Sequence, residues 1–370
     1  MTRFDPLALL CGLAALVSFG LTGFAVSGAL DISLTLGLIL LIASAIARLR
    51  KRAQRFEAPL TAAGTVLAAF ALVAALPSDN EAHATLGFVA AMVATWLGAW
   101  RLVNAIIGGT PARGAGRVIA NLAAPVIFGA TLLFLWECIT RGFGVPRVIL
   151  PPPSAIAARF AGSLPVLGVD FLQTLRGVAA GYLIGSGAGL LVAILIDRIP
   201  FLQRGLLPLG NLVSALPIVG IAPIMVMWFG FDWPSKAAVV VIMTFFPMLV
   251  NANAGLAAAG AMESDLMKTY GASYAQTLTK LRLPAALPFI FNGLKINSTL
   301  ALIGAIVAEF FGTPIVGMGF RINAEVGRMN IDMVWATILV AALFGSAFYG
   351  LVALIERQAT FWHPSYRQRS

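Results

Sequence analysis

Long apolar runs alternate with short polar segments along the chain. A run of about 20 apolar residues is long enough to cross a lipid bilayer as a helix. Such runs occur about ten times, at 7–27, 32–48, 58–77, 84–107, 118–140, 172–196, 206–230, 236–257, 290–312 and 333–355. Of the 370 residues, 59% are hydrophobic and 11% are charged, unlike a soluble domain. The pattern predicts an all-α polytopic membrane protein.

The basic residues indicate the orientation of the spans. If the N-terminus is cytoplasmic, most of the 25 Lys and Arg residues fall at cytoplasmic ends of spans, as the positive-inside rule requires. We therefore expect both termini, and the polar segment at 263–284, in the cytoplasm. Contacts with lipid headgroups explain the net charge of +10, so we expect no nucleic acid partner.

The first apolar run has two interpretations. Residues 1–29 resemble a signal peptide, with Arg3 near the start and a cleavage-like Ser27-Gly28-Ala29 at the end. The apolar stretch is long for a signal peptide and follows Asp5, which favours a retained span. Both interpretations give the next span the same orientation.

Two segments interrupt the spans. The Gly/Pro/Arg-rich segment 108–117 is typical of a linker. The proline-rich segment 145–154 should be extended and lead into a short interfacial helix at 154–164. We therefore divide the chain into a four-span N-terminal extension, 1–117, and a core, 118–370.

The polar segment, residues 263–284, is the longest polar stretch between apolar runs. It carries two sets of apolar residues at helical spacing: Met262, Leu266 and Tyr270, then Tyr274, Leu278 and Leu281. We expect two short amphipathic helices, each with one apolar stripe that can dock on a partner.

Local signals separate these two helices. Gly271 stands where a helix C-terminus favours a residue that tolerates positive φ. Ser273 and Gln276 have the capping-box spacing that begins a new helix. Pro284 and Pro288 are expected to end it.

The sequence lacks the residue patterns of an enzyme. Cys11 and Cys138 lie in apolar spans and are expected to be buried rather than disulfide-bonded. His83 and His363 are isolated, which argues against a metal site. No G-x-x-x-x-G-K-[ST] motif occurs. We expect no catalytic residue, metal ion or cofactor, and no nucleotide hydrolysis by this chain alone.

The span at 172–196 carries a glycine face. Overlapping G-x-x-x-G units place glycine at every fourth position, namely Gly177, Gly181, Gly185 and Gly189. This spacing lets another helix approach closely, either within the subunit or across a dimer.

Prolines and polar side chains in the later spans favour a transport pathway over an inert anchor. Broken helices are predicted at Pro208, Pro217, Pro223 and Pro247. The candidate pathway residues are Asn251, Asn297, Ser298 and Glu309. Glu137 and Glu309 fall near the outer ends of their spans, and each serves either the pathway or a structural hydrogen bond.

The polar segment resembles the signature loop of bacterial ABC importer permeases. That pattern is E-A-A, three residues, G, nine residues, then I-x-L-P. The matching positions are Gly271, Leu281, Leu283 and Pro284, while Asp265 replaces the glutamate and Leu266 and Met267 replace the alanines. The first half of the motif is therefore degenerate.

Further phrases resemble the subfamily that imports nitrate, bicarbonate, taurine and aliphatic sulfonates. They are Leu150-Pro-Pro-Pro-Ser154, 174–181, 222–230, Phe245-Phe-Pro247 with Asn251, Ala308-Glu-Phe-Phe-Gly312 and Gly317-Met-Gly319. The resemblance covers 118–360, and the four N-terminal spans depart from the family's usual six-span layout.

The resemblance implies a type I importer of the bacterial inner (plasma) membrane. Its partners would be cytoplasmic ABC ATPase subunits, an extracytoplasmic substrate-binding protein, and a second permease in a homodimer or a pair with a related permease. The coupling loop at 258–288 would contact the ATPase. The positions carried over to that role are Asp265, Leu266, Lys268, Tyr270, Gly271, Ala272, Leu281 and Pro284.

The function implied is that of a non-catalytic permease subunit that forms the substrate pathway while its partners hydrolyse ATP. The substrate would be a small, anionic solute such as a sulfonate or nitrate. A secondary transporter or channel without an ATPase partner is the alternative, although the sequence shows no clear internal repeat or midplane carboxylates. A membrane enzyme would need a His, Asp or Glu cluster at a water-accessible face.

Overall fold

The structure, a computed structural model, describes residues 6–20, 29–49, 56–76, 84–107, 115–199, 201–202, 204–206, 208, 210, 217–312 and 315–362. Within these ranges the regular elements are helices and no strand occurs, which confirms the all-α prediction. The chain forms two compact units, Met1–Ala158 and Arg159–Ser370. Ser27, Gly28, most of the 108–117 linker, His83 and His363 lie outside the described residues.

The helices match the predicted spans in position. In the described part of the chain, seven helices are long and apolar enough to cross a membrane. Three shorter apolar helices, Pro6–Ser18, Ile32–Arg48 and Ile218–Phe229, occupy the other predicted spans. The multi-pass membrane fold is therefore confirmed, and the count of about ten spans stays a prediction.

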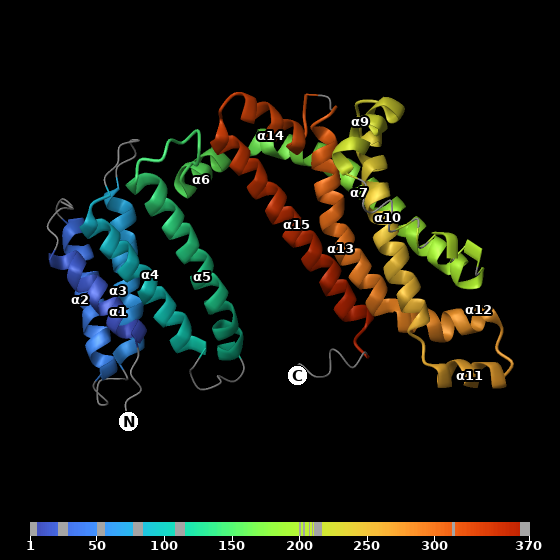
Figure 1. Ribbon diagram of the computed structural model, residues 1–370, viewed down its shortest axis with the longest axis horizontal. Helices are drawn as coiled ribbons and strands as arrows, with labels where there is room; N and C mark the ends of the chain where they lie inside the picture. Colours follow the sequence, from blue (N-terminus) through green and yellow to red (C-terminus); the bar gives the residue numbers. More distant parts are fainter. Residues whose placement is uncertain are drawn as a thin grey trace. The chain divides into compact units, whose positions relative to one another are not determined.

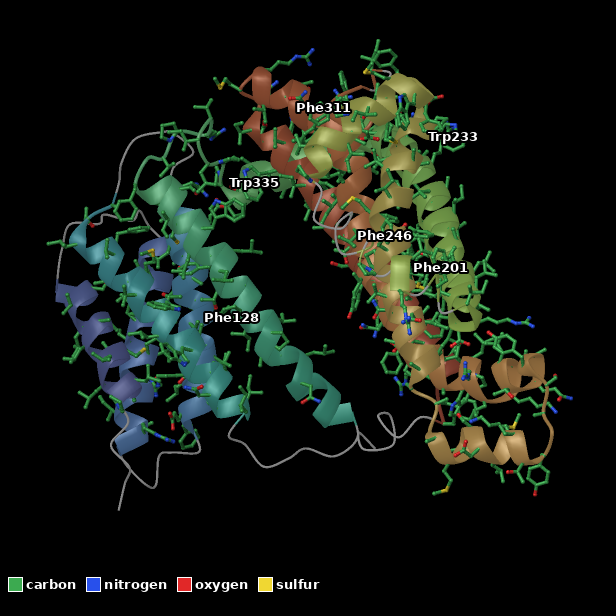
Figure 2. The ribbon with its side chains drawn as sticks, turned by 45° about the vertical axis from the view of Figure 1, so that its right-hand side comes forward. Phe128, Phe201, Trp233, Phe246, Phe311 and Trp335 are labelled. Carbon is green, nitrogen blue, oxygen red and sulfur yellow. The ribbon has the colours of Figure 1, made fainter. Side chains whose placement is uncertain are left out.

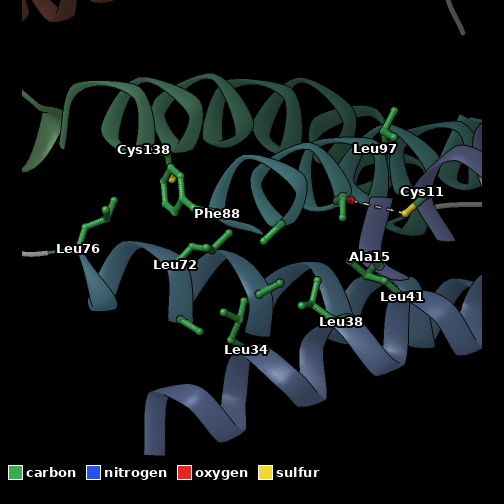
Figure 3. Packing of buried hydrophobic residues seen from close by; sticks show 14 residues of the cluster. Cys11, Ala15, Leu34, Leu38, Leu41, Leu72, Leu76, Phe88, Leu97 and Cys138 are labelled. Carbon is green, nitrogen blue, oxygen red and sulfur yellow. Dashed lines mark hydrogen bonds between the residues drawn. The ribbon is translucent and has the colours of Figure 1, made fainter. Parts of the chain in front are cut away.

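The first unit packs its helices around one apolar core. They are α1 (Pro6–Gly20), α2 (Ala29–Leu49), α3 (Glu57–Ala75), α4 (Leu86–Ile107) and α5 (Ala115–Gly142). Leu41, Leu72 and Phe88 are fully buried there, as Figure 3 shows. Cys11 and Cys138 are buried and free, as predicted.

The first unit also buries a charge. Arg101, only 5% exposed, pairs with Glu57 at 3.1 Å and donates a hydrogen bond to the Ser44 hydroxyl at 3.0 Å. A buried guanidinium needs such partners because an unpaired charge is costly in an apolar core. This pair links α4 to α3 and α2.

The boundary between the two units falls within α6 (Pro153–Gly162), the short helix predicted at 154–164. Helix α5 contacts α3 and α4 of the first unit. The acidic Glu137 at its end is 5% exposed, pairs with Arg141 at 3.0 Å and accepts a hydrogen bond from the Ser154 backbone at 2.9 Å. The division of the sequence at 117 stays a prediction.

The second unit is built around α10 (Trp233–Ala257), which packs against α7 (Leu164–Arg198) and α13 (Leu283–Glu309). Helix α9 (Ile218–Phe229) contacts α10 and α13, and α15 (Ile331–Ala359) packs on α13. The short helices α11 (Ala261–Thr269) and α12 (Tyr274–Thr277) lie at one end of this unit, called here the loop end. Helix α14 (Met318–Gly327) lies at the opposite end, called here the far end (Figure 1). The side chains of Trp233 and Phe311 lie at the far end (Figure 2).

The glycine face of α7 packs on α10 within the subunit. A methyl group added at Gly189 would lie 2.5 Å from the carbonyl oxygen of Phe245, and one added at Gly181 would overlap Val240. Real side chains do not approach this closely, so only glycine permits the observed spacing of the helices. This contact decides between the two uses that the sequence left open.

Two of the predicted helix breaks are wrong. Pro223 lies inside α9 and Pro247 inside α10, and both helices continue through them. An interior proline costs one backbone hydrogen bond, but α9 and α10 pack on each other and on α13, and this packing holds the helices together. Pro217 instead precedes the first residue of α9.

Candidate functional site: the polar segment and the polar clusters of the second unit

The first half of the polar segment forms an exposed helix. Helix α11 (Ala261–Thr269) has no buried residue. Its predicted apolar stripe is uncovered, because Met262 is 82% exposed, Leu266 56% and Tyr270 80%. On the same helix, Lys268 and Asp265 form an exposed ion pair at 2.9 Å, which is worth little in water. Apolar residues aligned on a water-exposed helix are typical of a docking face.

Gly271 ends this helix as the sequence predicts. Its φ is +68°, in the left-handed region that favours glycine. The Gly271 N–H donates to the Lys268 carbonyl, and the Ala272 N–H donates to the Met267 carbonyl, both at 2.9 Å. These two bonds make a Schellman motif, which satisfies carbonyls at the helix end and turns the chain sharply.

A capping box begins the second half at Ser273. The Ser273 hydroxyl accepts a hydrogen bond from the Gln276 backbone, and the Gln276 side chain accepts one from the Ser273 backbone at 2.8 Å. Helix α12 (Tyr274–Thr277) follows directly. The two helices are therefore held at a defined turn by backbone geometry on both sides.

The second half does not present its stripe to solvent. Leu278 packs on an apolar cluster that includes Ile196 of α7 and Leu256 of α10. The Tyr274 hydroxyl donates to the Asp197 carboxylate at 3.1 Å, and Arg282 donates to the same oxygen at 2.5 Å. The prediction that both stripes are free to dock on a partner is therefore wrong for the second half, which docks on the chain's own helices.

The segment continues into α13 without a stop. A π-helical turn, η2 (Leu278–Arg282), joins α12 to α13. The Leu283 N–H donates to the Leu278 carbonyl, five residues back. Pro284 then falls in the first turn of α13, where its missing N–H is not needed. The prediction that Pro284 and Pro288 end the helix is wrong. The π turn and the first-turn position accommodate Pro284, and α13 continues through Pro288 in its interior.

The candidate pathway residues fall into two environments. Asn297 and Ser298 are fully buried, and Asn297 donates to the Ser186 hydroxyl at 2.9 Å and to the Thr244 carbonyl at 2.7 Å. By contrast, Asn251 accepts a hydrogen bond at 3.0 Å from Asn292, which is exposed. Of these two environments, the Asn251–Asn292 pair is the one that solvent reaches.

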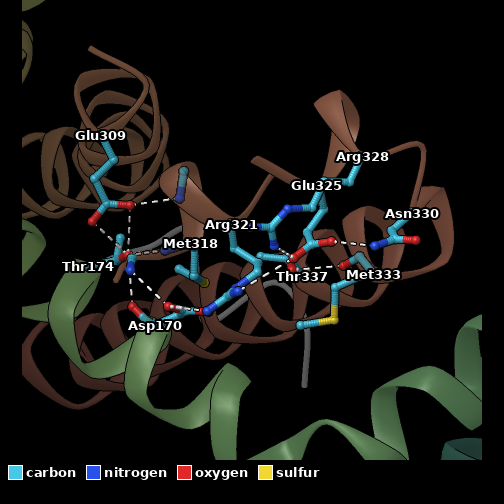
Figure 4. Close-up of polar contacts among 12 residues, drawn as sticks. Asp170, Thr174, Glu309, Met318, Arg321, Glu325, Arg328, Asn330, Met333 and Thr337 are labelled. Atoms are coloured by element: carbon cyan, nitrogen blue, oxygen red, sulfur yellow. Dashed lines mark hydrogen bonds and ion pairs between the residues drawn. The ribbon is translucent and has the colours of Figure 1, made fainter. Parts of the chain in front are cut away.

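Glu309 lies in a polar cluster at the far end (Figure 4). It is 2% exposed and accepts hydrogen bonds from the Thr174 hydroxyl at 2.9 Å and the Gly319 backbone at 2.7 Å. Thr174 in turn accepts one from the Met318 backbone at 2.9 Å. The carboxylate therefore connects the end of α13 to the start of α14 and to α7.

Asp170 joins α7 to α14 in the same cluster. It is fully buried, accepts the Gly317 N–H at 2.9 Å and pairs with Arg321 at 2.7 Å. The hydrogen bond from Arg321 to Asp170 raises the pKa of Arg321 further above its ordinary value. Burial favours a higher pKa for Glu325, but the hydrogen bond from Asn330 and the charge of Arg328 outweigh it and hold that pKa below its ordinary value. Both charges persist near neutral pH.

Sequence reasoning missed two carboxylates, Asp170 and Asp197. The predicted span began at 172, so Asp170 fell outside it, whereas α7 begins at Leu164. A signal existed for Asp197, because a carboxylate in the last turn of a helix opposes the helix dipole and needs a cation nearby. Arg282 supplies that cation at 2.5 Å.

Known proteins resemble this chain over somewhat less than two thirds of its length. An ABC transporter permease protein of Haemophilus influenzae is 31% identical over 62% of this chain and 93% of its own length. A formylaminopyrimidine transport permease protein of Halalkalibacterium halodurans is 31% identical over 64% and 95%. An aliphatic sulfonates transport permease protein of Bacillus subtilis is 30% identical over 65% and 88%.

A protein family model matches residues 162–360. This range contains the polar segment, the buried contacts of Asn297, and the cluster of Glu309 and Asp170. That range is more than half of the chain. The apolar helices and this match confirm a multi-pass inner-membrane protein and the predicted resemblance to ABC importer permeases. The chain belongs to the family of binding-protein-dependent transport system inner membrane components.

Proposed function

We propose that this chain is the permease subunit of an ATP-driven importer and that α11 docks on a cytoplasmic ABC ATPase. The observation that carries the proposal is the uncovered stripe of Met262, Leu266 and Tyr270, held at a fixed turn by Gly271. A partner that buries this stripe gains the hydrophobic free energy that the chain itself leaves unused. The second half, packed on α7 and α10, connects that partner to the membrane helices.

We infer that the loop end lies in the cytoplasm. Lys280 and Arg282 lie in the π-helical turn that follows α12. Arg198, the last residue of α7, lies at the same end of the unit. Basic residues at span ends favour the cytoplasmic side. Both termini are then cytoplasmic, and the Glu309 and Asp170 cluster faces the side from which a substrate-binding protein approaches.

The importer complex also needs a second permease subunit. One chain supplies one coupling loop, whereas a pair of ATPase subunits needs two. The permease partner is another copy of this chain or a related permease. Native mass spectrometry of the complex should find two permease subunits, and an active complex with a single permease core would contradict this.

The substrate pathway runs along the exposed amide pair rather than through the buried polar residues. Asn251 and Asn292 contact each other at the surface of α10 and α13, where a second permease can face them. Asn297 and Glu309 have partners on other helices and hold the helices together, whereas Ser298 donates to the Lys295 carbonyl of its own helix. Asn251→Ala should therefore change the transport rate or substrate preference while leaving the thermal unfolding temperature nearly unchanged.

The substrate is a small solute delivered by the binding protein. Similar permeases are named for formylaminopyrimidine and for aliphatic sulfonates, which differ in charge and shape. A sulfonate or nitrate is compatible with this range, and the binding protein supplies most of the selectivity. Mass spectrometry of the ligand carried by the co-purified binding protein identifies the substrate directly.

The N-terminal extension, residues 1–117, lies outside the matched family range. Its described helices form a packed core and a buried Arg101–Glu57 pair, so its role is structural support or contact with a further partner. Deleting 1–117 should leave uptake by the core measurable, provided that insertion and abundance are preserved. Complete loss of uptake under those conditions would give the extension a mechanistic role.

Two measurements separate this function from a secondary transporter or channel. The purified chain alone should not hydrolyse ATP, and the complex with its ATPase should. Uptake into proteoliposomes should require ATP on the side of the membrane that carries the ATPase. It should persist when ionophores collapse the ion gradients. ATP-independent uptake driven by an ion gradient would instead support the secondary transporter.

A further inference from the structure

Helix α7 is tied to other elements at both of its ends. Near its C-terminal end, the Asp197 carboxylate receives hydrogen bonds from Tyr274 and Arg282 of the polar segment. The Arg198 guanidinium lies 5.2 Å from the centre of the Tyr274 ring, where a cation–π contact adds to the attachment. The second half of the polar segment is thus fixed to α7 by several different contacts.

The opposite end of α7 is tied to α14, to the residue before it and to the end of α13. Asp170 pairs with Arg321 and accepts the Gly317 N–H, while Thr174 bonds to Glu309 and to the Met318 backbone. Asp170, Thr174 and Glu309 are buried and Arg321 is partly buried, so these hydrogen bonds are not exchanged for water without cost. Movement of this end of α7 must therefore move α14 or break the cluster.

The helix between these attachments is supported along its length. The 28 residues from Asp170 to Asp197 span about 40 Å at the rise of an α-helix. The glycine face holds α7 against α10 at backbone contact distance, and closely packed helices do not bend or slide without losing contacts. This packing favours movement of α7 and α10 as one body.

We propose that Asp197 is a positioning residue that transfers movement of the polar segment to α7, and that α7 carries this movement to the Asp170–Arg321 cluster at the far end. The proposal rests on the proposed function, because it requires α11 to be moved by an ATPase. Its specific content is that this attachment at Asp197 is needed for coupling but not for docking. The docking stripe on α11 and the Asp197 contacts lie on different halves of the segment.

The geometry predicts how each contact contributes. Asp197→Asn keeps the shape of the side chain but removes the charge that holds Arg282. This ion pair is partly shielded from solvent, because the Asp197 side chain is 14% exposed and the Arg282 side chain 31%. Tyr274→Phe removes the hydroxyl bond to Asp197 and a weaker one to the Ile194 carbonyl of α7 at 3.4 Å, while leaving the Asp197–Arg282 pair in place. The double variant Asp197→Arg with Arg282→Asp reverses both charges and can restore the pair.

The test uses the full complex of permease, ATPase and substrate-binding protein in proteoliposomes. Three quantities are measured for each variant: the amount of ATPase that co-purifies, the stimulation of ATP hydrolysis by substrate-loaded binding protein, and uptake. For Asp197→Asn we expect normal co-purification, with stimulation and uptake each reduced at least about tenfold, equivalent to roughly 1.4 kcal/mol of lost coupling. The charge-reversed pair should recover much of both.

The control variant breaks an ion pair that involves no residue of α7. Asp332→Asn removes the charge from the Arg159–Asp332 pair of the second unit, whose atoms are 3.6 Å apart, and should leave stimulation unchanged. Asp170→Asn, at the other end of α7, should reproduce the uncoupling of Asp197→Asn. If Asp197→Asn fails to fold, Tyr274→Phe and the charge-reversed pair decide the question.

The outcomes distinguish this inference from the proposed function. If the unaltered chain binds no ATPase, the proposed function fails. If it binds the ATPase and the folded Asp197 variants keep full stimulation, only the role of Asp197 is overturned. Equal loss of stimulation in Asp332→Asn would also overturn it, because the effect would then reflect general loosening of the unit.

Discussion

The two halves of the polar segment have similar sequence patterns and opposite environments. Each carries apolar residues at helical spacing, yet the stripe on α11 is exposed and the stripe that begins at Tyr274 packs on α7 and α10. The difference arises from the Gly271 turn, which directs the chain back toward its own helices only after α11 has ended. An amphipathic pattern therefore predicts that a face will be covered, but the turns decide whether the chain or a partner covers it.

The largest expected effect concerns the exposed half. Changing Met262 and Leu266 together to Asp should reduce ATPase association by at least about tenfold, because buried apolar anchors dominate binding free energy. The thermal unfolding temperature of the permease should stay nearly constant, since both side chains are exposed. Co-purification and calorimetry measure the two quantities.

Ser264→Asp is the matched control for that variant, because it adds charge to the same helix outside the stripe. It should retain association. Equal loss in the control would mean that net charge, rather than the stripe, governs docking.

The next effect concerns the packed half. Leu278 is half-buried in the cluster shared by α7 and α10, so Leu278→Ala should lower the free energy of unfolding by about 1–2 kcal/mol, less than for a fully buried leucine. Leu266→Ala, on the exposed half, should change it by less than about 0.5 kcal/mol. Denaturant unfolding in detergent compares the pair, and equal losses would remove the distinction between the halves.

A smaller effect is expected at the turn between the halves. Gly271→Val forces a branched side chain into a backbone conformation with positive φ, at a cost of roughly 1 kcal/mol or more. ATPase association and uptake should both fall while membrane insertion persists. Asp265→Lys, on the exposed half, should also reduce association. Gly271→Asn is the control, because asparagine tolerates this conformation better than valine. Normal association in Gly271→Val would show that the conformation of this turn is not needed for ATPase docking.

The smallest effect is expected at the cap of the second half. Ser273→Ala removes one side of the capping box and should lower stability by about 1 kcal/mol or less, because Tyr274 and Arg282 still hold the helix to Asp197. Ser273→Asp keeps an acceptor at this position and should behave like the unaltered chain. Hydrogen exchange at the Gln276 amide reports the change, and equal exchange in both variants would show that the cap is unimportant.

The sequence predicted what depends on neighbouring residues. The apolar runs located the helices, Gly271 and Ser273 located the turn, and the glycine spacing identified the close-packed face of α7. These signals are local, because turn conformation, capping and helical periodicity are properties of a few consecutive residues.

The sequence did not predict what depends on distant partners. Asp197 meets Arg282 and Asp170 meets Arg321 across large separations in sequence. The position of Asp197 at a helix end indicates that a cation is needed, but no local pattern identifies which residue supplies it. The continuity of the helix through Pro284 was also missed, because it depends on a π-helical turn. The buried bonds of Asn297 could not be separated from a pathway role until its neighbours on α7 and α10 were known.

Site-specific photo-crosslinking compares the two halves most directly. A benzophenone amino acid is placed at Leu266 or at Leu278 in the assembled complex, with Phe70 of α3, which is 62% exposed in the first unit, as a third position. The account predicts an ATPase adduct from position 266, crosslinks within the permease from position 278, and no ATPase adduct from position 70. The absence of an ATPase adduct at 266, or equal adducts at 266 and 278, would contradict the claim that α11 alone carries the docking face.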